Sequence, residues 1–193
     1  MALKSLSLAC ILIPAAFGQS SQVDVLAGVT TSAATVSAPG VSVNAGRTAS
    51  VLADYALRLV ERPTGNLYLE LPAARIHKAS VGVSPDRVTA GVSQFFFTPG
   101  VRYELAPRAR VSPYGVAGFG FGWFDNADVQ VNGPVRVNVL EGLKPAAAVG
   151  AGAEFHITRR IGFRVEMRDF INCAAGIAGR NHVTFNGGFG FRF

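Results

Sequence analysis

The segment His156-Ile157-Thr158 carries the pattern that comes closest to covalent chemistry. A histidine beside a hydroxyl can act as a general base for a nucleophile when a carboxylate orients its ring. Serine is the usual nucleophile, and Thr158 stands in its place. The other histidines, His77 and His182, have no cysteine or carboxylate motif of the kind that binds zinc. We therefore expect no catalytic residues, no metal and no cofactor.

Charges that alternate with apolar residues are a more informative group. Between residues 161 and 168, arginine and glutamate share alternate positions with glycine, and Ile, Phe, Val and Met fill the positions between them. A spacing of two puts these two classes on opposite faces of a β-strand, whereas an α-helix would mix them around its surface. These side chains must therefore be positioned by a sheet.

The same period recurs along the chain and predicts eight strands. It is clearest at the C-terminus, where Phe189, Phe191 and Phe193 alternate with glycine and arginine. The composition agrees, because the 193 residues include 22 Gly and 14 Phe and only 16% are charged. The expected strands cover residues 22–31, 50–61, 66–76, 94–105, 111–124, 145–157, 160–170 and 183–193.

The connections between these strands alternate in length. Links near 62–65, 106–110 and 158–159 are short, and links near 32–49, 77–93, 125–144 and 171–182 are long. In a bilayer every backbone N–H and C=O must be paired, so a sheet crosses only as a closed barrel. We predict an all-β fold, a single eight-stranded antiparallel transmembrane up-and-down β-barrel with short periplasmic turns and long extracellular loops.

In this barrel the charged face would line the lumen and the apolar face would meet lipid. Eight strands leave room only for side chains, so we expect ion pairs to fill the lumen and a wide pore to be absent. Glycines on this face should make room for the long arginine side chains. The predicted lumen ion-pair network is Asp24, Asp54, Arg58, Glu70, Arg102, Glu104, Glu154, Arg164, Glu166, Arg168 and Arg192.

Other residue types should mark the two membrane surfaces. Aromatic side chains favour the membrane–water interface. Arginines at the short turns (Arg62, Arg108, Arg110, Arg159 and Arg160) are either solvated or in contact with inner-leaflet headgroups or acidic periplasmic partners. The predicted interface aromatics are Tyr103, Tyr114, Trp123, Phe124 and Phe193.

The N-terminus predicts export. Lys4 precedes an apolar stretch, which is followed by the small-residue ending Ala16-Phe17-Gly18. The stretch is shorter than the ~20 residues that a helix needs to cross a bilayer. We assign residues 1–18 to a cleaved signal peptide and 19–193 to the barrel domain. Cleavage leaves Cys173 as the only cysteine, so we expect no intramolecular disulfide.

Two segments carry a family resemblance. The ending Gly187-Gly188-Phe189-Gly190-Phe191-Arg192-Phe193 resembles the C-terminal signal of bacterial outer-membrane barrels. The segments 98–103 and 112–120 resemble consecutive strands of the OmpA-like and OmpX-like small barrels. The resemblance covers residues 19–193 and implies the outer membrane of a Gram-negative bacterium, contact with lipid and lipopolysaccharide, and insertion by machinery that reads Phe189, Phe191 and Phe193.

The expected function is a structural or surface-display role, in envelope integrity or adhesion, for a monomeric barrel that is not an enzyme. Nucleic acid is not an expected partner, because the basic residues form no cluster despite a net charge of +6. Three alternatives stay open: a narrow porin-like channel for small solutes, a lipid A-modifying acyl hydrolase that uses His156, and a soluble lipocalin-like binder with its apolar face inside. Nothing in the long loops names their ligand.

Overall fold

The computed structural model describes residues 20–33, 42–45, 47–84, 88–130, 142–173 and 181–193. The predicted signal peptide and parts of the long links lie outside these residues. Among the described residues, no helix is long and apolar enough to cross a membrane. The strands are β1 (Ser21–Ala33), β2 (Ser42–Ala45), β3 (Arg47–Glu61), β4 (Gly65–Ser84), β5 (Val88–Phe97), β6 (Gly100–Leu105), β7 (Val111–Gln130), β8 (Gly142–His156), β9 (Ile161–Asn172) and β10 (Asn181–Arg192).

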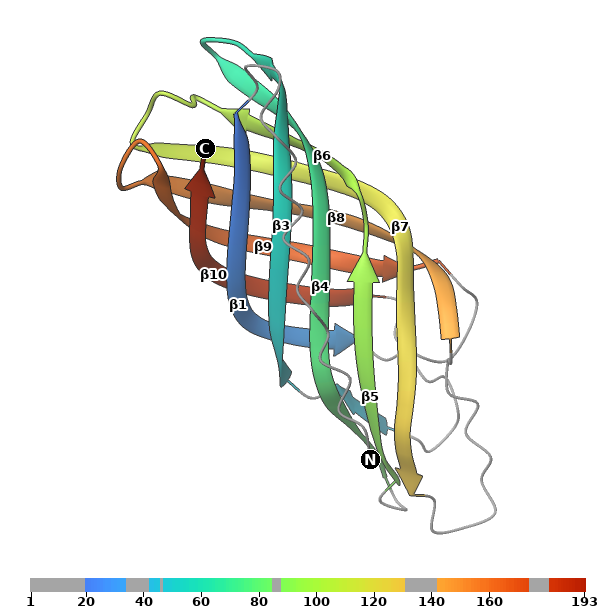
Figure 1. Cartoon of the computed structure of the whole chain (residues 1–193). Helices are drawn as coiled ribbons and strands as arrows, with labels where there is room; N and C mark the ends of the chain where they lie inside the picture. The colour runs from blue at the N-terminus through green and yellow to red at the C-terminus, as the bar shows by residue number, and fades with distance from the viewer. Residues whose placement is uncertain (1–19, 34–41, 46, 85–87, 131–141, 174–180) are drawn as a thin grey trace, which may run out of the picture.

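The sheet closes on itself through its first and last long strands (Figure 1). β1 pairs antiparallel with both β3 and β10. At the end of this seam, the backbones of Ser21 and Phe193 exchange two hydrogen bonds of 3.0 Å. β5 and β6 share one place in the wall, because both pair with β4 and β7, and the chain between them passes through Thr98 and Pro99. The predicted eight-stranded antiparallel barrel is therefore confirmed.

Strands on the long-link side continue beyond the predicted boundaries. β4 runs to Ser84 and β7 to Gln130, where we expected ends at 76 and 124. The short strand β2 lies within the link predicted at 32–49, and it pairs with residues 81–84 of β4. The register shifts between Ile76 and Ala79 in the β4–β5 pairing and between Ala90 and Gly91 in the β5–β7 pairing, and backbone pairing continues beyond both shifts. Sequence pattern thus located the amphipathic part of each strand and not the full ladder.

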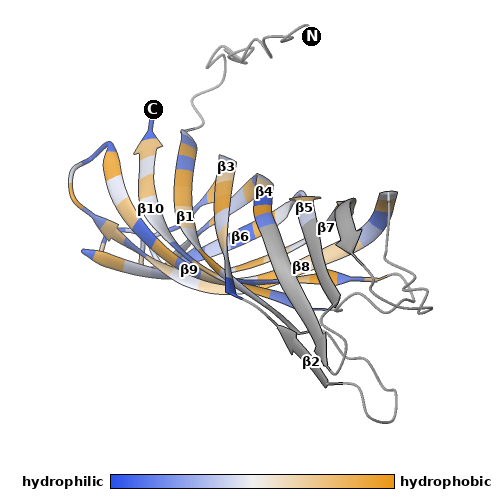
Figure 2. Ribbon diagram, turned by 90° about the horizontal axis from the view of Figure 1, so that it is seen from below, coloured by the Kyte–Doolittle hydropathy of each residue, from blue (hydrophilic) through white to orange (hydrophobic). Residues whose placement is uncertain are grey.

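Hydrophobic and hydrophilic residues alternate along the strands (Figure 2), and the burial of their side chains shows that the two faces of the wall differ in polarity. Along β9, Arg164, Glu166 and Arg168 are buried in the lumen, while Val165 and Met167 are exposed on the outer wall. Large apolar side chains, among them Phe119, are likewise exposed on other strands. A contiguous apolar outer wall of this kind requires lipid and not water. The lipocalin-like alternative, which places the apolar face inside, is therefore wrong.

Candidate functional site in the barrel lumen

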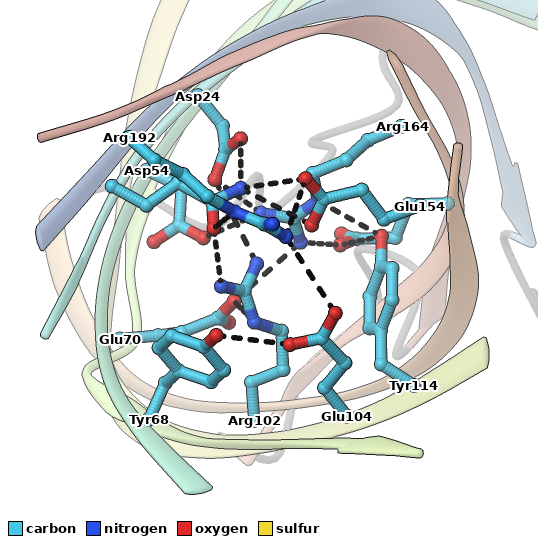
Figure 3. A network of polar contacts seen from close by, with 12 residues as sticks. Asp24, Asp54, Tyr68, Glu70, Arg102, Glu104, Tyr114, Glu154, Arg164 and Arg192 are labelled. Carbon is cyan, nitrogen blue, oxygen red and sulfur yellow. Dashed lines mark hydrogen bonds and ion pairs between the residues drawn. The ribbon is translucent and has the colours of Figure 1, made fainter. Parts of the chain in front are cut away.

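Arg164 is the centre of a charged network that spans the lumen (Figure 3). Asp24 on β1 stands directly opposite Asp54 on β3 in the ladder, and both are buried. Two like charges in this position repel each other. The Arg164 guanidinium, which comes from β9, compensates them, because Nη1 bonds Asp24 Oδ2 and lies 3.3 Å from Asp54 Oδ2. One cation thus joins β9 to β1 and β3 across the lumen.

Glu70 and Glu166 connect the other two buried arginines to this centre. Arg168 Nε donates to Glu166 Oε1 at 2.6 Å, and its Nη2 donates to Glu70 Oε2 at 3.1 Å. Arg102 Nε lies 3.4 Å from Glu70 Oε1. Arg164 Nη2 donates to Glu166 Oε2 at 2.9 Å. The acids therefore share cations instead of forming separate pairs, which is how several charges can be buried together.

A second group lies next to the short turns. Arg192 Nη2 is 2.8 Å from Glu154 Oε1 and 3.6 Å from Glu104 Oε1. It is also 2.8 Å from Nε2 of His156. Gln22 links this group to the centre, because its Oε1 accepts from Arg192 Nε at 3.2 Å and from Arg102 Nη2 at 3.1 Å.

Ten of the eleven predicted lumen charges belong to this connected set, which we call the charged network: Asp24, Asp54, Glu70, Arg102, Glu104, Glu154, Arg164, Glu166, Arg168 and Arg192. The exception is Arg58. It pairs at 2.9 Å with the exposed Glu61 near the end of β3, where the pairing with β4 shifts register between Arg58 and Val60. Arg58 itself still lies opposite Tyr68 in the ladder, but its guanidinium pairs with Glu61 instead of with a network acid.

Two of the predicted interface aromatics lie in the lumen, and their assignment was wrong. Tyr103, Trp123 and Phe193 are exposed on the outer wall, whereas Tyr114 is 4% and Phe124 1% exposed. Both share the inward face of β7 with its glycines, because side chains two residues apart point the same way. The Tyr114 hydroxyl donates to Glu166 Oε2 at 3.0 Å and accepts from Arg164 Nε at 3.1 Å.

Tyr68 and Gln22 are network residues that sequence reasoning missed. The Tyr68 hydroxyl donates to Glu104 Oε2 at 2.9 Å. Its ring lies under the Arg102 guanidinium, with 4.3 Å from Cζ to the ring centroid, a cation–π contact. The two-residue alternation could have identified both. Tyr68 lies two residues before Glu70, and Gln22 lies two residues before Asp24, so each shares the inward face with a predicted network acid.

Three glycines of the lumen face make room for the side chains of acids and a tyrosine, where we predicted arginine. A Cβ atom on Gly162 would overlap the carboxylate of Glu154, and one on Gly190 would overlap that of Asp24. A Cβ on Gly152 would overlap the Tyr114 hydroxyl. Small residues thus allow short acidic side chains to bend toward the shared cations.

An apolar layer fills the part of the lumen that lies nearer the long links. The Phe96 ring stacks on Phe170 with centroids 4.8 Å apart and meets Phe124 edge-on at 5.7 Å. The buried ring of His182 lies 5.5 Å from Phe96. Sequence analysis predicted only ion pairs here. We call the layer the apolar plug: Leu26, Leu52, Ala74, Ile76, Phe96, Phe124, Ala146, Ala148 and Phe170.

His156 and Thr158 do not form a nucleophile–base pair. His156 Nδ1 lies 2.8 Å from the carbonyl oxygen of Ala109, and Nε2 contacts Arg192. The Thr158 hydroxyl accepts from the backbone N–H groups of Arg160 and Ile161 at 3.2 and 2.9 Å. The hydroxyl therefore serves the turn between β8 and β9, and both ring nitrogens are engaged elsewhere.

A closed barrel with an apolar outer wall and a packed lumen defines an integral membrane β-barrel. The model of the outer membrane protein beta-barrel domain matches residues 3–193. The chain therefore belongs to this family and is an outer-membrane barrel protein. No curated protein sequence matches it.

Solved structures of small outer-membrane proteins share the fold. Neisserial surface protein A matches with a TM-score of 0.66 and 12% identity, over 90% of this chain and 97% of that one. OprG from Pseudomonas aeruginosa matches with a TM-score of 0.62 and 12% identity, over 91% and 97%. The outer membrane enzyme PagL matches with a TM-score of 0.53 and 16% identity, over 89% and 98%. At these identities the likeness shows the fold alone.

Proposed function

We propose that this protein is a non-enzymatic, non-conducting barrel that displays its long loops at the cell surface and contributes to envelope integrity or adhesion. The observation that carries the proposal is the double filling of the lumen. The charged network occupies the short-turn side, and the apolar plug occupies the long-link side. A permeating solute would have to cross both layers in series.

The two layers oppose permeation for different reasons. An ion entering the network must separate buried pairs such as Arg168–Glu166, which leaves uncompensated charges. The same ion must then shed water to pass between the rings of Phe96, Phe124 and Phe170, which replace little of the lost hydration. The narrow-channel alternative needs a continuous polar path, which the plug interrupts.

The acyl-hydrolase alternative loses its support at the same residues that suggested it. The Thr158 hydroxyl accepts a hydrogen bond from the backbone N–H of Ile161 in the turn, and His156 contacts Arg192 and Ala109. The likeness to PagL extends to the fold and, at 16% identity, no further. Incubation of the purified protein with lipid A, followed by mass spectrometry, should show no release of fatty acid.

The proposed partners would bind to the outer wall and to the last strand. Apolar side chains such as Phe119 and Trp123 would contact outer-membrane lipid and lipopolysaccharide acyl chains. Phe189, Phe191 and Phe193 all point outward from the end of the chain, where the insertion machinery could bind them. Export through a cleaved signal peptide at 1–18 belongs to the same proposal.

Surface display can be tested with an epitope inserted between residues 136 and 137, in the link between β7 and β8. We expect antibody labelling of intact cells that express this variant. A matched epitope inserted between Arg108 and Ala109, in a short turn, should be labelled only after the outer membrane is permeabilised. Labelling in the reverse order would contradict the proposed orientation and display.

A further inference from the structure

Three potential metal ligands meet at the short-turn end of the lumen. Glu104 lies near the end of β6, and Glu154 and His156 lie near the end of β8. One ligand atom from each, two carboxylate oxygens and an imidazole nitrogen, lie within 4.8 Å of one another. The expectation that the chain has no metal site rested on His77 and His182. It did not consider residues that separate strands bring together.

The imidazole of His156 is oriented as a metal ligand is. Its Nδ1 lies 2.8 Å from the Ala109 carbonyl oxygen, which can only accept, so Nδ1 carries the proton. The lone pair of Nε2 is then directed to the other side of the ring, where Glu104 Oε1 lies 3.6 Å away. A hydrogen bond from the second ring nitrogen to a backbone carbonyl is the usual support of a metal-bound histidine.

Glu104 supplies an independent observation. Its side chain is 2% exposed, and one oxygen, Oε2, accepts from the Tyr68 hydroxyl. The other, Oε1, is buried and has no hydrogen-bond donor among the described residues. An unsatisfied buried carboxylate oxygen is costly. This atom is the one that lies 3.6 Å from Nε2 of His156.

Arg192 now holds the place that a metal would take. Its Nη2 contacts Glu154 and His156 at 2.8 Å but reaches only within 3.6 Å of Glu104 Oε1. The Arg192 side chain is 23% exposed, whereas that of Arg164 is fully buried. Arg192 is thus the arginine of the charged network that solvent reaches most readily. It is therefore a cation that another cation can replace.

We propose that Glu104, Glu154 and His156 form a binding site for a divalent transition-metal ion, best suited to Zn²⁺, from which the metal displaces the guanidinium of Arg192. One imidazole nitrogen and two carboxylate oxygens suit zinc, and water can complete a four-coordinate shell. Zinc–ligand distances of about 2.0–2.2 Å require the three atoms to draw together once the guanidinium has left. Mg²⁺ prefers oxygen ligands alone and should bind more weakly.

The test is calorimetric titration of the detergent-solubilised protein, purified from the outer-membrane fraction and stripped with a chelator, with ZnCl₂. We expect one Zn²⁺ per chain. Glu154→Gln and His156→Gln should each weaken binding at least tenfold, because each removes a ligand. The exposed His77 provides the matched control, since His77→Gln should bind as the wild type does. Heat-dependent mobility on SDS gels verifies that each variant is folded.

Arg192→Gln should change the affinity for Zn²⁺ in the opposite direction, so this test does not rely on a loss of binding. Removal of the competing cation should tighten Zn²⁺ binding about tenfold relative to the wild type. The site is refuted if neither wild type nor Arg192→Gln takes up Zn²⁺. It is also refuted if His156→Gln and His77→Gln bind Zn²⁺ equally, or if Mg²⁺ binds as tightly as Zn²⁺.

Discussion

The two halves of the lumen are lined by the same sheet, yet they are held by opposite chemistry. Near the short turns, Arg164 and its acids join opposite walls through directed ion pairs. Near the long links, Phe96, Phe124 and Phe170 fill the space by contact between rings. The charged half depends on every partner being present, whereas the apolar half depends chiefly on how completely its side chains fill the space. The lumen is therefore closed by two layers, the charged network and the apolar plug, that rely on different interactions.

The difference predicts how each half responds to a mutation. Removal of one charge leaves its former partners buried and unpaired, so the cost exceeds the net contribution of the pair itself. Removal of an apolar ring leaves a cavity, and the cost follows the volume that neighbours cannot refill. The variants below exploit this contrast, from the largest expected effect to the smallest.

Arg164→Met should have the largest effect. It leaves Asp24 and Asp54 opposite each other without their shared cation, so we expect a loss of about 5 kcal/mol in the free energy of unfolding. Urea unfolding of the barrel in detergent micelles measures it. The variant Arg164→Met, Asp24→Asn, Asp54→Asn should recover part of the loss. No recovery would contradict the role of Arg164 as their common partner.

Phe124→Ala tests the apolar plug against the outer wall. The Phe124 ring is buried against Phe96, so its truncation should cost about 3 kcal/mol. Its neighbour Trp123 is exposed on the opposite face, and Trp123→Ala should cost clearly less in the same urea experiment. Equal losses would show that the inward and outward faces of β7 had been assigned incorrectly.

Tyr114→Phe should have an intermediate effect. Loss of the hydroxyl removes one hydrogen bond to Glu166 and one from Arg164, at a cost of about 1–3 kcal/mol. Tyr103→Phe is the matched control, because Tyr103 is exposed on the outer wall. Tyr103→Phe should stay within about 0.5 kcal/mol of the wild type. A larger cost for Tyr103→Phe than for Tyr114→Phe would contradict the placement of Tyr114 in the lumen.

The sequence predicted those features that follow from a local period. The number of barrel strands and the inward orientation of ten network charges come from a two-residue alternation that each segment carries within itself. Tyr114 and Phe124 were misassigned because residue type was given more weight than that alternation. Their positions on the face of Gly118, Gly120 and Gly122 would have placed them in the lumen.

The remaining features depend on which residues of different strands lie at the same height. The meeting of Phe96, Phe124 and Phe170 in one layer follows from the stagger between β5, β7 and β9. The approach of His156 to Glu104 follows from the pairing of both β6 and β8 with β7. A one-residue slip would send these side chains to the other face, and no single segment specifies the pairing.

Arg58→Gln should have the smallest effect and marks the limit of the charged network. Its partner Glu61 is 59% exposed, and pairs of this kind contribute about 0–1 kcal/mol. We expect a change within about 0.5 kcal/mol in urea unfolding. A loss comparable to that of Arg164→Met would place Arg58 within the network after all.

Conductance across a planar lipid bilayer tests the central claim of a doubly closed lumen most directly. The wild-type protein, shown to be folded by its heat-dependent mobility on SDS gels, should insert without producing current steps at any KCl concentration. The variant Phe96→Ala, Phe124→Ala should also stay closed, because the charged network remains in series with the opened plug. Current steps from the wild type that grow with KCl concentration would contradict the account and establish a channel.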